Sequence, residues 1–360
     1  MRVVHVINRL IGGGAEVMVP LIHRCHLSDG IDSWIVSMET PDDRDTDRVV
    51  AFGEKVPRWK ELFLLRDILR KMDQEAPINL IHTHLTQSQL FAKWAARGLS
   101  KRPLLVTTEH DTHNRRRNLP FGKVFDRFLY SGYDQIFCIS EGVQESMEEW
   151  IPDLSQKLVT VPNGVELEPL LDIERDGNGQ NPVRFLSMGR LIEKKNFDTT
   201  IRALASLAQL DWEYTIVGEG EELDSWKSLA SELRVENRVT FVGYTKDTVP
   251  YYRANDVFLL PSLWEGFGLV AAEAMGAGMP VLASDVPGLA EVVGKDGKAG
   301  QLLPPGKVDV WAAAIRHLIE NPADRRRIGM FGRERSKDYS VAETAKGYRR
   351  HYDHLLKGEL

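Results

Sequence analysis

Residues 257–275 read VFLLPSLWEGFGLVAAEAM, and this stretch indicates the fold class. An apolar run of strand length, Val257–Leu260, leads through a glycine-flanked turn into an alanine-rich segment that predicts a helix over Leu269–Ala277. A helix N-terminus presents unpaired backbone N–H groups to anions such as phosphate, and the carboxylates of Glu265 and Glu273 can accept hydrogen bonds from hydroxyls. The stretch therefore predicts a strand–turn–helix unit that binds a phosphorylated, polyhydroxylated ligand. The alternative is an ordinary helix start with two incidental acids.

The same alternation of short apolar runs and helical patterns extends through both halves of the chain. Strands are predicted at Val3–Ile7, Ser33–Ser37, Leu80–His82, Leu104–Thr108, Gln135–Ile139, Leu158–Val161, Arg184–Met188, Tyr214–Val217, Val239–Val242, Val257–Leu260 and Pro280–Ser284. Helices are predicted at Ala15–Cys25, Trp59–Gln74, Ser88–Gly98, Gly142–Trp150, Asp198–Gln209, Glu221–Leu233, Leu269–Ala277, Val308–Glu320 and Ala342–Leu356. Such alternation implies parallel sheets covered by helices on both faces, so the fold class is α/β.

A polar segment divides the two halves. Residues 168–182 read EPLLDIERDGNGQNP, which is rich in turn formers and lacks periodicity. A chain of 360 residues also exceeds the usual size of one hydrophobic core. We therefore expect two doubly wound, Rossmann-like domains at 1–168 and 183–338, a linker at 169–182 and a C-terminal helical segment at 339–360. Such sheets bind ligands at the carboxyl ends of their strands, so the domains are expected to face an interdomain cleft.

Composition excludes several classes of protein. The hydrophobic content of 42% and charged content of 27% are those of a soluble protein, and the net charge of −6 argues against a nucleic-acid partner. Cys25 and Cys138 are the only cysteines, which excludes a disulfide scaffold and suits a reducing compartment. Neither a signal-peptide core nor an apolar run of membrane-spanning length occurs. We therefore expect a cytoplasmic protein whose membrane contact, if any, is peripheral and at the inner face.

Two motifs follow predicted strands in the first half. In residues 11–16, IGGGAE, Gly13 and Gly14 permit close approach of a phosphate to the backbone at a helix start. The motif is not G-x-G-x-x-G and no acidic ribose ligand closes the second strand, so a dinucleotide site is not predicted. The alternative is an ordinary tight turn. His110 follows the strand Leu104–Thr108 and can act as donor, acceptor or proton carrier, although a lone histidine is more often structural.

One loop in the second half predicts a cationic clamp. Residues 187–196 read SMGRLIEKKN and follow the first strand of that half. Arg190 and Lys195, beside Gly189, could neutralise the charge that grows on a departing diphosphate. The alternative is a solvated basic loop.

No metal site is predicted. The D-x-D run within residues 43–47 lies in a polar loop that no strand precedes. His82 and His84 lack further ligands at metal spacing, and Cys138 is too isolated to complete a site. Residues 217–221, VGEGE, fit a ligand contact and an ordinary turn equally well.

Residues 115–128, RRRNLPFGKVFDRF, interleave basic and apolar side chains. This pattern fits anionic lipid headgroups or a phosphorylated acceptor. It fits a solvated helix face over a packed aromatic stripe slightly better.

Together these segments resemble the retaining GT-B glycosyltransferases of family 4, also called glycosyl transferases group 1. The resemblance covers nearly the whole chain and is most specific in SMGRLIEKKNFDTTIRAL (187–204), YTIVGEGEEL (214–223), NRVTFVGY (237–244) and YYRANDVFLLPSLWEGFGLVAAEAMGAGMPVLASDVPGLAEVV (251–293). VPNGVE (161–166) and GGGAE (12–16) also look like that family. Each match is weak alone, but their joint order and spacing make coincidence improbable.

The resemblance implies two groups of site residues. The expected catalytic residues are His110, Arg190, Lys195 and Glu265. The expected donor-binding residues are Gly13, Gly14, Gly189, Phe267, Gly268, Leu269 and Glu273. Glu273 looks like the carboxylate that binds the donor ribose, and Glu265 like the one near the donor sugar. Arg190 and Lys195 look like the pair that holds the diphosphate as it leaves.

The activity implied is transfer, with retention, of a sugar from a UDP- or GDP-linked donor to a glycan, lipid-linked or small-molecule acceptor (EC 2.4), as in polysaccharide or lipopolysaccharide assembly. The first domain would bind the acceptor and the second the donor, with the C-terminal helix returning to the first domain. Neither a cofactor nor a metal is expected. Two alternatives stay open: a sugar-nucleotide epimerase or hydrolase on the same fold, and a non-catalytic, transferase-like subunit.

Overall fold

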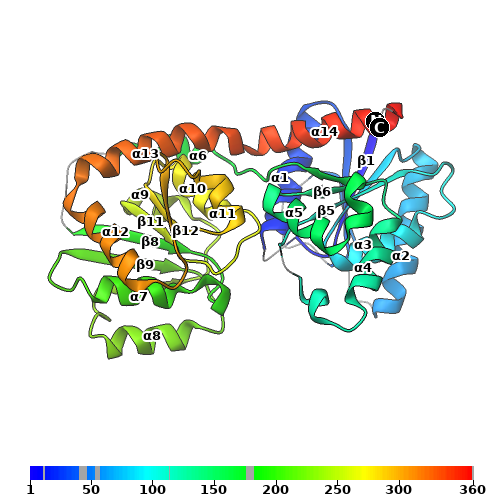
Figure 1. The fold of residues 1–360 in the computed structure, drawn as a ribbon. Helices are drawn as coiled ribbons and strands as arrows, with labels where there is room; N and C mark the ends of the chain where they lie inside the picture. The colour runs from blue at the N-terminus through cyan, green and yellow to red at the C-terminus, as the bar shows by residue number, and fades with distance from the viewer. Residues whose placement is uncertain (11–12, 40–46, 53–56, 113, 176–181, 359–360) are drawn as a thin grey trace. The chain divides into compact units, whose positions relative to one another are not determined.

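A computed structural model describes residues 1–10, 13–39, 47–52, 57–112, 114–175 and 182–358. The chain divides into an N-terminal unit, Met1–Gly164 with Val341–Leu360, and a C-terminal unit, Val165–Ser340 (Figure 1). This division falls before the expected linker, because Leu167 and Leu170 are buried beside Gly276 and so fold with the C-terminal unit.

The N-terminal unit contains a seven-stranded parallel sheet in the order β3-β2-β1-β4-β5-β6-β7. Its strands are β1 (Arg2–Ile7), β2 (Asp32–Ser37), β3 (Val49–Ala51), β4 (Leu80–His84), β5 (Leu104–Glu109), β6 (Gln135–Cys138) and β7 (Leu158–Thr160). All the strands predicted for this half are confirmed. The strand β3 was not predicted, because three residues are too few to show a periodicity.

Helices cover both faces of this sheet. They are α1 (Gly14–Ser28), α2 (Arg58–Glu75), α3 (Thr86–Ala95), α4 (Gly122–Ser131), α5 (Glu141–Trp150) and α14 (Val341–Lys357), with 3₁₀ turns η1 (Arg115–Asn118) and η2 (Pro152–Lys157). α14 packs against α1, and α2 packs against α3 (Figure 1). The buried Tyr348 and Tyr352 of α14 reach the sheet, where their hydroxyls hydrogen-bond Thr108 Oγ1 at 3.2 Å and His82 Nδ1 at 2.6 Å. The end of the chain therefore completes the core of the N-terminal unit.

The C-terminal unit contains a six-stranded parallel sheet in the order β10-β9-β8-β11-β12-β13. Its strands are β8 (Val183–Met188), β9 (Trp212–Val217), β10 (Val239–Gly243), β11 (Val257–Leu260), β12 (Val281–Ser284) and β13 (Gly300–Leu303). Its helices are α6 (Glu168–Leu171), α7 (Phe197–Ala205), α8 (Leu223–Glu232), α9 (Val249–Ala254), α10 (Leu269–Gly276), α11 (Pro287–Val293), α12 (Val308–Glu320) and α13 (Pro322–Ser336), with 3₁₀ turns η3 (Glu193–Lys195) and η4 (Lys337–Tyr339). The α/β class with two parallel sheets is confirmed.

Five strands and helices of this unit were not predicted: α6, which lies in the stretch expected to lack periodicity, and β13, α9, α11 and α13. The sequence of α13, PADRRRIGMFGRERS, has no continuous apolar face. Its fit depends on glycines instead: a Cβ on Gly329 would strike the carbonyl oxygen of Gly278, and one on Gly332 would lie 3.1 Å from that of Ala299. Close backbone packing of this kind has no local sequence signature.

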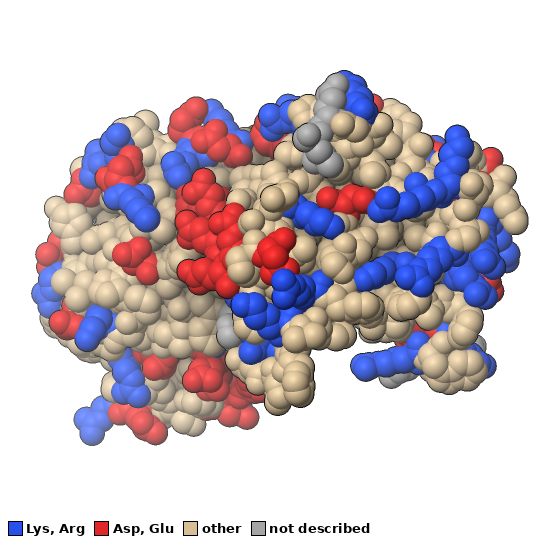
Figure 2. Space-filling model, turned by 45° about the vertical axis from the view of Figure 1, so that its right-hand side comes forward, with Lys and Arg blue, Asp and Glu red and all other residues tan. Residues whose placement is uncertain are grey.

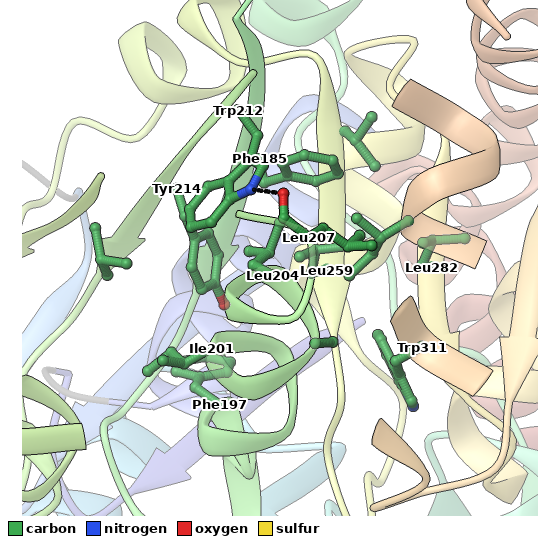
Figure 3. Packing of buried hydrophobic residues seen from close by; sticks show 14 of the residues in the cluster. Phe185, Phe197, Ile201, Leu204, Leu207, Trp212, Tyr214, Leu259, Leu282 and Trp311 are labelled. Atoms are coloured by element: carbon green, nitrogen blue, oxygen red, sulfur yellow. Dashed lines mark hydrogen bonds between the residues drawn. The ribbon is translucent and has the colours of Figure 1, made fainter. Parts of the chain in front are cut away.

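Aromatic side chains fill the core between the C-terminal sheet and its helices (Figure 3). Trp212 and Tyr214 of β9 are buried beside Phe197 of α7. The indole N–H of Trp212 donates to the carbonyl oxygen of Leu207 at 3.1 Å, so the polar edge of the ring is satisfied. This core makes the carboxyl ends of β8, β9 and β11 a rigid base for the loops that follow them.

Among the described residues, no helix combines the length and the apolar character needed to cross a membrane.

Candidate functional site

The loop after β8 carries the predicted cationic clamp and is positioned by glycines. Gly189 has a φ of 145°, and a Cβ there would lie 2.9 Å from Cε of Lys195. A Cβ on Gly218, which follows β9, would strike the carbonyl oxygen of Gly189. The loops after these two strands therefore meet backbone to backbone, as only glycine permits. For residues 217–221 this favours a role in loop packing over a direct ligand contact.

Glu265 is the carboxylate around which the side chains of Lys194, Lys195 and Ser262 gather. It is only 8% exposed. Lys195 Nζ donates to Glu265 Oε1, Lys194 Nζ lies 3.7 Å from Oε2, and Ser262 Oγ donates to Oε1 at 3.1 Å. Burial by itself would raise the pKa of the carboxyl, but the charges of Lys195 and Lys194 and the hydrogen bonds hold it below its usual value. Glu265 is therefore a fixed anion that positions two lysines.

The structure differs from the predicted clamp in its pairing. Arg190 is exposed on the same loop, whereas Lys195 is joined on Glu265 by Lys194, which the sequence reasoning missed. The only available signal was the Lys194–Lys195 doublet. Two contacts tie this loop to the one after β11: the Leu263 N–H donates to the Lys194 carbonyl at 2.9 Å, and the Asn196 amide donates to the carbonyl of Pro261 at 3.1 Å.

The helix α10 begins where these loops meet. Gly268, its N-cap, has a φ of 95°, and a Cβ there would strike the side chain of Leu289. A Cβ on Gly288 would lie 2.6 Å from the carbonyl oxygen of Glu265, so α11 also packs tightly on this turn. Phe267 is buried with its ring edge against Tyr339, which leaves its backbone to meet a ligand. The unpaired amides of the first turn, next to two lysines, make an environment that favours anions.

Glu273 has an environment opposite to that of Glu265. Its Oε2 accepts a hydrogen bond of 2.6 Å from the hydroxyl of Tyr252 on α9. Burial raises the pKa of Glu273 to about 7, against the smaller lowering effect of that hydrogen bond. The two glutamates therefore do not act as an equivalent pair: one is a paired anion, and the other titrates near neutrality. Sequence reasoning missed Tyr252 because nothing in the motif of α10 indicates its partner on α9.

His110 lies in the N-terminal unit, directly after β5. Neither of its ring nitrogens has a hydrogen-bond partner in the described part of the chain, although both are shielded from solvent. Burial lowers its pKa to about 4, so the ring is neutral at pH 7. A neutral imidazole with both nitrogens unpaired can donate to or accept from a ligand. His113, three residues further along the chain, lies outside the described residues.

Gly13 and Gly14 lie at the start of α1, with Gly13 as the N-cap. A Cβ on Gly13 would lie 2.6 Å from a carboxylate oxygen of Glu16. Glu16 is buried and pairs with Arg9 at 3.4 Å. A phosphate at this turn would meet that carboxylate, so local geometry supports the tight-turn alternative more than a phosphate site. Gly12, and the D-x-D run at 43–45, lie outside the described residues.

Three buried histidines meet on the sheet of the N-terminal unit. His5 pairs in register with His82, and one ring nitrogen from each of His5, His82 and His84 lies within 4.8 Å of the others. The expectation that His82 and His84 lack further ligands at metal spacing was wrong, because the strand pairing supplies His5. Both nitrogens of His82 are occupied, by Tyr352 at 2.6 Å and Thr108 at 2.7 Å, and His5 Nδ1 lies 3.2 Å from His84 Nε2. We therefore interpret the cluster as a hydrogen-bonded network, not as an open ligand set.

Comparisons with known proteins identify the family. The family Glycosyltransferase Family 4 matches residues 12–169, and Glycosyl transferases group 1 matches residues 172–335. The chain is 26% identical over 357 residues to the phosphatidyl-myo-inositol mannosyltransferase of Mycobacterium leprae, covering 95% of this chain and 93% of that protein. It is 31% identical over 207 residues to the lipopolysaccharide core biosynthesis glycosyltransferase LpsE of Rhizobium meliloti, covering 56% and 58%.

Solved structures show the same fold. The Anabaena protein HepE in complex with UDP and glucose superimposes with a TM-score of 0.82 at 20% identity, covering 98% of this chain and 99% of that one. Sucrose-phosphate synthase from Thermosynechococcus elongatus superimposes with a TM-score of 0.80 at 23% identity, covering 99% and 100%. With both of its halves matched, the chain belongs to the family 4, group 1 glycosyltransferases of the GT-B fold, and it is a transferase of class EC 2.4.

Proposed function

We propose that this glycosyltransferase moves a sugar, with retention of configuration, from a UDP- or GDP-linked donor to a glycan, lipid-linked or small-molecule acceptor. The observation that carries the proposal is the group formed by Glu265, Lys194 and Lys195 at the start of α10. It gathers positive charge and unpaired amides at the carboxyl end of β11. That is the arrangement needed to hold a diphosphate leaving group.

The lysines and the exposed Arg190 would stabilise the charge that develops on the departing diphosphate. In this structure Lys195 is held by Glu265, so the carboxylate keeps the ammonium group in place before the donor arrives. Because protein cations can supply this stabilisation, we propose that no metal ion is needed. A helix N-terminus adds a fixed partial positive charge at the same place.

Glu273 and His110 would contact other parts of the donor. We assign the donor ribose to Glu273, whose oxygens can accept hydrogen bonds from the two ribose hydroxyls. We assign the transferred sugar to His110, whose ring nitrogens are unpaired. Gly189 and the backbone of Phe267, Gly268 and Leu269 would allow close approach to the phosphates. For Gly13 and Gly14 we propose a backbone contact with the bound substrates and no further role.

Retention is proposed from the state of Glu265. An inverting transferase needs a free carboxylate or imidazole as base on the acceptor side. The pKa of Glu265 is lowered by two lysines, and burial lowers the pKa of His110 to about 4, which makes both groups poor proton acceptors. The leaving diphosphate would then take the proton of the acceptor hydroxyl on the same face of the sugar.

The acceptor and pathway are proposed by analogy with the relatives. Names among them specify lipopolysaccharide core biosynthesis and phosphatidyl-myo-inositol. We propose a polysaccharide or lipopolysaccharide acceptor for this chain and a cytoplasmic location. Cys25 and Cys138, both among the described residues, are not joined in a disulfide, which suits a reducing compartment.

The test combines donor screening with product analysis. Thermal shift against a panel of UDP- and GDP-sugars should single out the donor, because a bound ligand stabilises the folded state. NMR of the product should show the anomeric configuration of the donor. Glu273→Ala should mainly raise the donor KM and Glu265→Ala should mainly lower kcat, whereas Glu236→Ala, an exposed acid, should change neither.

Three outcomes would contradict the proposal. An inverted product would exclude retention. Complete consumption of donor in the absence of any acceptor would favour a hydrolase or epimerase. Donor binding without turnover across an acceptor panel would favour a non-catalytic subunit.

A further inference from the structure

The outer face of α4 is apolar where a water-soluble helix is normally polar. Phe121 is 83% exposed, Val124 65% and Phe128 52%. Phe125 is also exposed, and Leu119 lies exposed just before the helix. Positions 121, 124, 125 and 128 follow the spacing of one helical face. The exposed apolar residues are therefore one continuous stripe rather than scattered side chains.

The inner face of the same helix carries buried polar groups beside one large apolar side chain, Leu129. Asp126 is fully buried, where its carboxylate accepts from Arg116 Nε at 2.6 Å and from the indole N–H of Trp150 at 3.0 Å. Tyr130, also buried, donates to Glu109. Most of the large apolar side chains of α4 therefore face away from its own domain, while Leu129 faces it. Burial in the unit explains the inner face, but it does not explain the apolar outer face.

The first residue of the stripe is held in an unfavourable backbone conformation. Phe121 has a φ of 66°, in the left-handed region that non-glycine residues rarely adopt. The next residue cannot change, because a Cβ on Gly122 would strike the carbonyl oxygen of Arg116. An asparagine or glycine would suit position 121 better for folding. The fold therefore tolerates backbone strain at a position that presents an exposed phenyl ring.

The part of the sequence that carries the stripe is basic. Residues 58–131, from α2 through α4, contain 14 Lys and Arg against 7 Asp and Glu, in a chain whose net charge is −6. Several of these cations lie on aromatic rings, such as Lys93 Nζ at 4.1 Å from the Phe128 centroid and Arg97 at 4.0 Å from that of the exposed Trp94. Figure 2 shows Lys and Arg gathering in groups on the face drawn there, with other residues between them. The surroundings of the stripe therefore favour an anionic partner.

We propose that this aromatic-basic face, made of Leu119, Phe121, Lys123, Val124, Phe125 and Phe128, docks on the surface of an anionic lipid bilayer. Apolar side chains on one helical face insert at the boundary between headgroups and acyl chains, while flanking cations meet anionic headgroups. Apolar insertion alone or charge attraction alone would bind the protein only weakly. An anionic bilayer supplies both an apolar layer and a sheet of negative charge. The face is separate from the residues of the proposed transfer reaction, so docking can be measured without donor or acceptor.

The test is sedimentation of the full chain with vesicles. Vesicles of equal parts phosphatidylglycerol and phosphatidylcholine should bind the protein, vesicles of phosphatidylcholine alone should bind it much more weakly, and added salt should weaken binding. Phe121→Asn should weaken binding at least about tenfold through lost apolar burial. Lys123→Gln should weaken it roughly fivefold through the lost charge.

Matched variants separate docking from folding. Phe121→Asn should keep or raise the Tm, because asparagine tolerates the left-handed backbone, while it weakens docking. Phe128→Asn should also weaken binding, whereas Phe331→Asn, at a similarly exposed phenylalanine of the C-terminal unit, should not. Lys227→Gln, at an exposed lysine of α8, is the control for charge.

The proposal is overturned if anionic vesicles do not bind the chain at low salt. It is equally overturned if Phe121→Asn and Phe128→Asn bind as the unchanged chain does, or if Phe331→Asn weakens binding as much. A face that binds only a protein partner would give the first of these results.

Discussion

Lowering the pH from 7 to 5 should unfold the N-terminal unit before the C-terminal unit. His5, His26, His82 and His84 are all buried there. Burial, the largest cause in each case, lowers the pKa of His26 to about 4 and that of the other three well below 6.5. Since the folded pKa values are depressed, the folded unit has its full stability above the unfolded pKa of 6.5. It loses that stability as the pH falls below 6.5, because only the unfolded chain takes up these protons.

The size of the effect follows from linkage. Between pH 7 and pH 5, proton uptake stabilises the unfolded chain by up to ~2 kcal/mol for each histidine, or about 7 kcal/mol for these four. His110, whose pKa burial also lowers to about 4, adds to this total in the same direction. That is comparable with the whole stability of a typical domain, roughly 5–15 kcal/mol. For a unit of 184 residues it corresponds to a fall in Tm of roughly 15–30 °C. The pKa of Glu109 is raised chiefly by burial, so this one carboxyl group takes up its proton more readily in the folded unit and opposes the loss of stability at low pH.

Thermal unfolding followed by circular dichroism at pH 7, 6 and 5 measures the loss, and hydrogen exchange assigns it to a unit. His26→Gln, which keeps a donor for the Ala345 carbonyl, should remove roughly one fifth of the dependence on pH, because four histidines and His110 contribute to it. His317→Gln, at an exposed histidine of the C-terminal unit, should leave it unchanged. If the Tm of the N-terminal unit moves by less than about 5 °C between pH 7 and pH 5, the histidines are not held neutral and the reasoning fails.

Three further predictions concern the C-terminal unit. Lys195→Ala should lower kcat by about 10²–10³ through lost stabilisation of the leaving group, as steady-state kinetics would show; an unchanged kcat would remove it from the site. Tyr252→Phe removes a hydrogen bond that lowers the pKa of Glu273, so the pKa of Glu273 should rise above 7. The donor KM of this variant should then increase several-fold at pH 7 and recover above pH 8. A donor KM that does not depend on pH would contradict this prediction. Gly268→Ala should destabilise the fold by about 1–3 kcal/mol in denaturant titrations, because of the φ of 95° and the contact with Leu289; a neutral substitution would show that the turn can relax.

Most elements of the fold could be predicted from local patterns. Strands such as β11, Val257–Leu260, are continuous apolar runs, and helices such as α12, Val308–Glu320, have an apolar face. The elements that were missed lack those patterns. The strand β3 is too short, and α13 packs through glycines on backbone that is distant in sequence.

The sequence predicted which loops carry the candidate site, but it did not predict which side chains touch one another there. Arg190, Lys195, Glu265 and Glu273 were selected because they follow strands or flank a helix start. The interpretation of Arg190 and Lys195 as a pair did not anticipate that Lys194 joins Lys195 on Glu265. The apolar outer face of α4 was also not predicted, because a stripe of phenylalanines is typical of a buried core until its exposure is known.

Sequence alone therefore determined the α/β class, the division into two halves and the strand ends that carry the loops of the candidate site, because periodicity and turn residues act over a few neighbouring positions. Only the tertiary structure decided which charges meet and which groups titrate. Lys195 and Glu265 are 70 residues apart, and His5 joins His82 only through the pairing of β1 with β4. Ionisation depends on burial and on distances of a few ångströms, and those quantities exist only once the chain has folded.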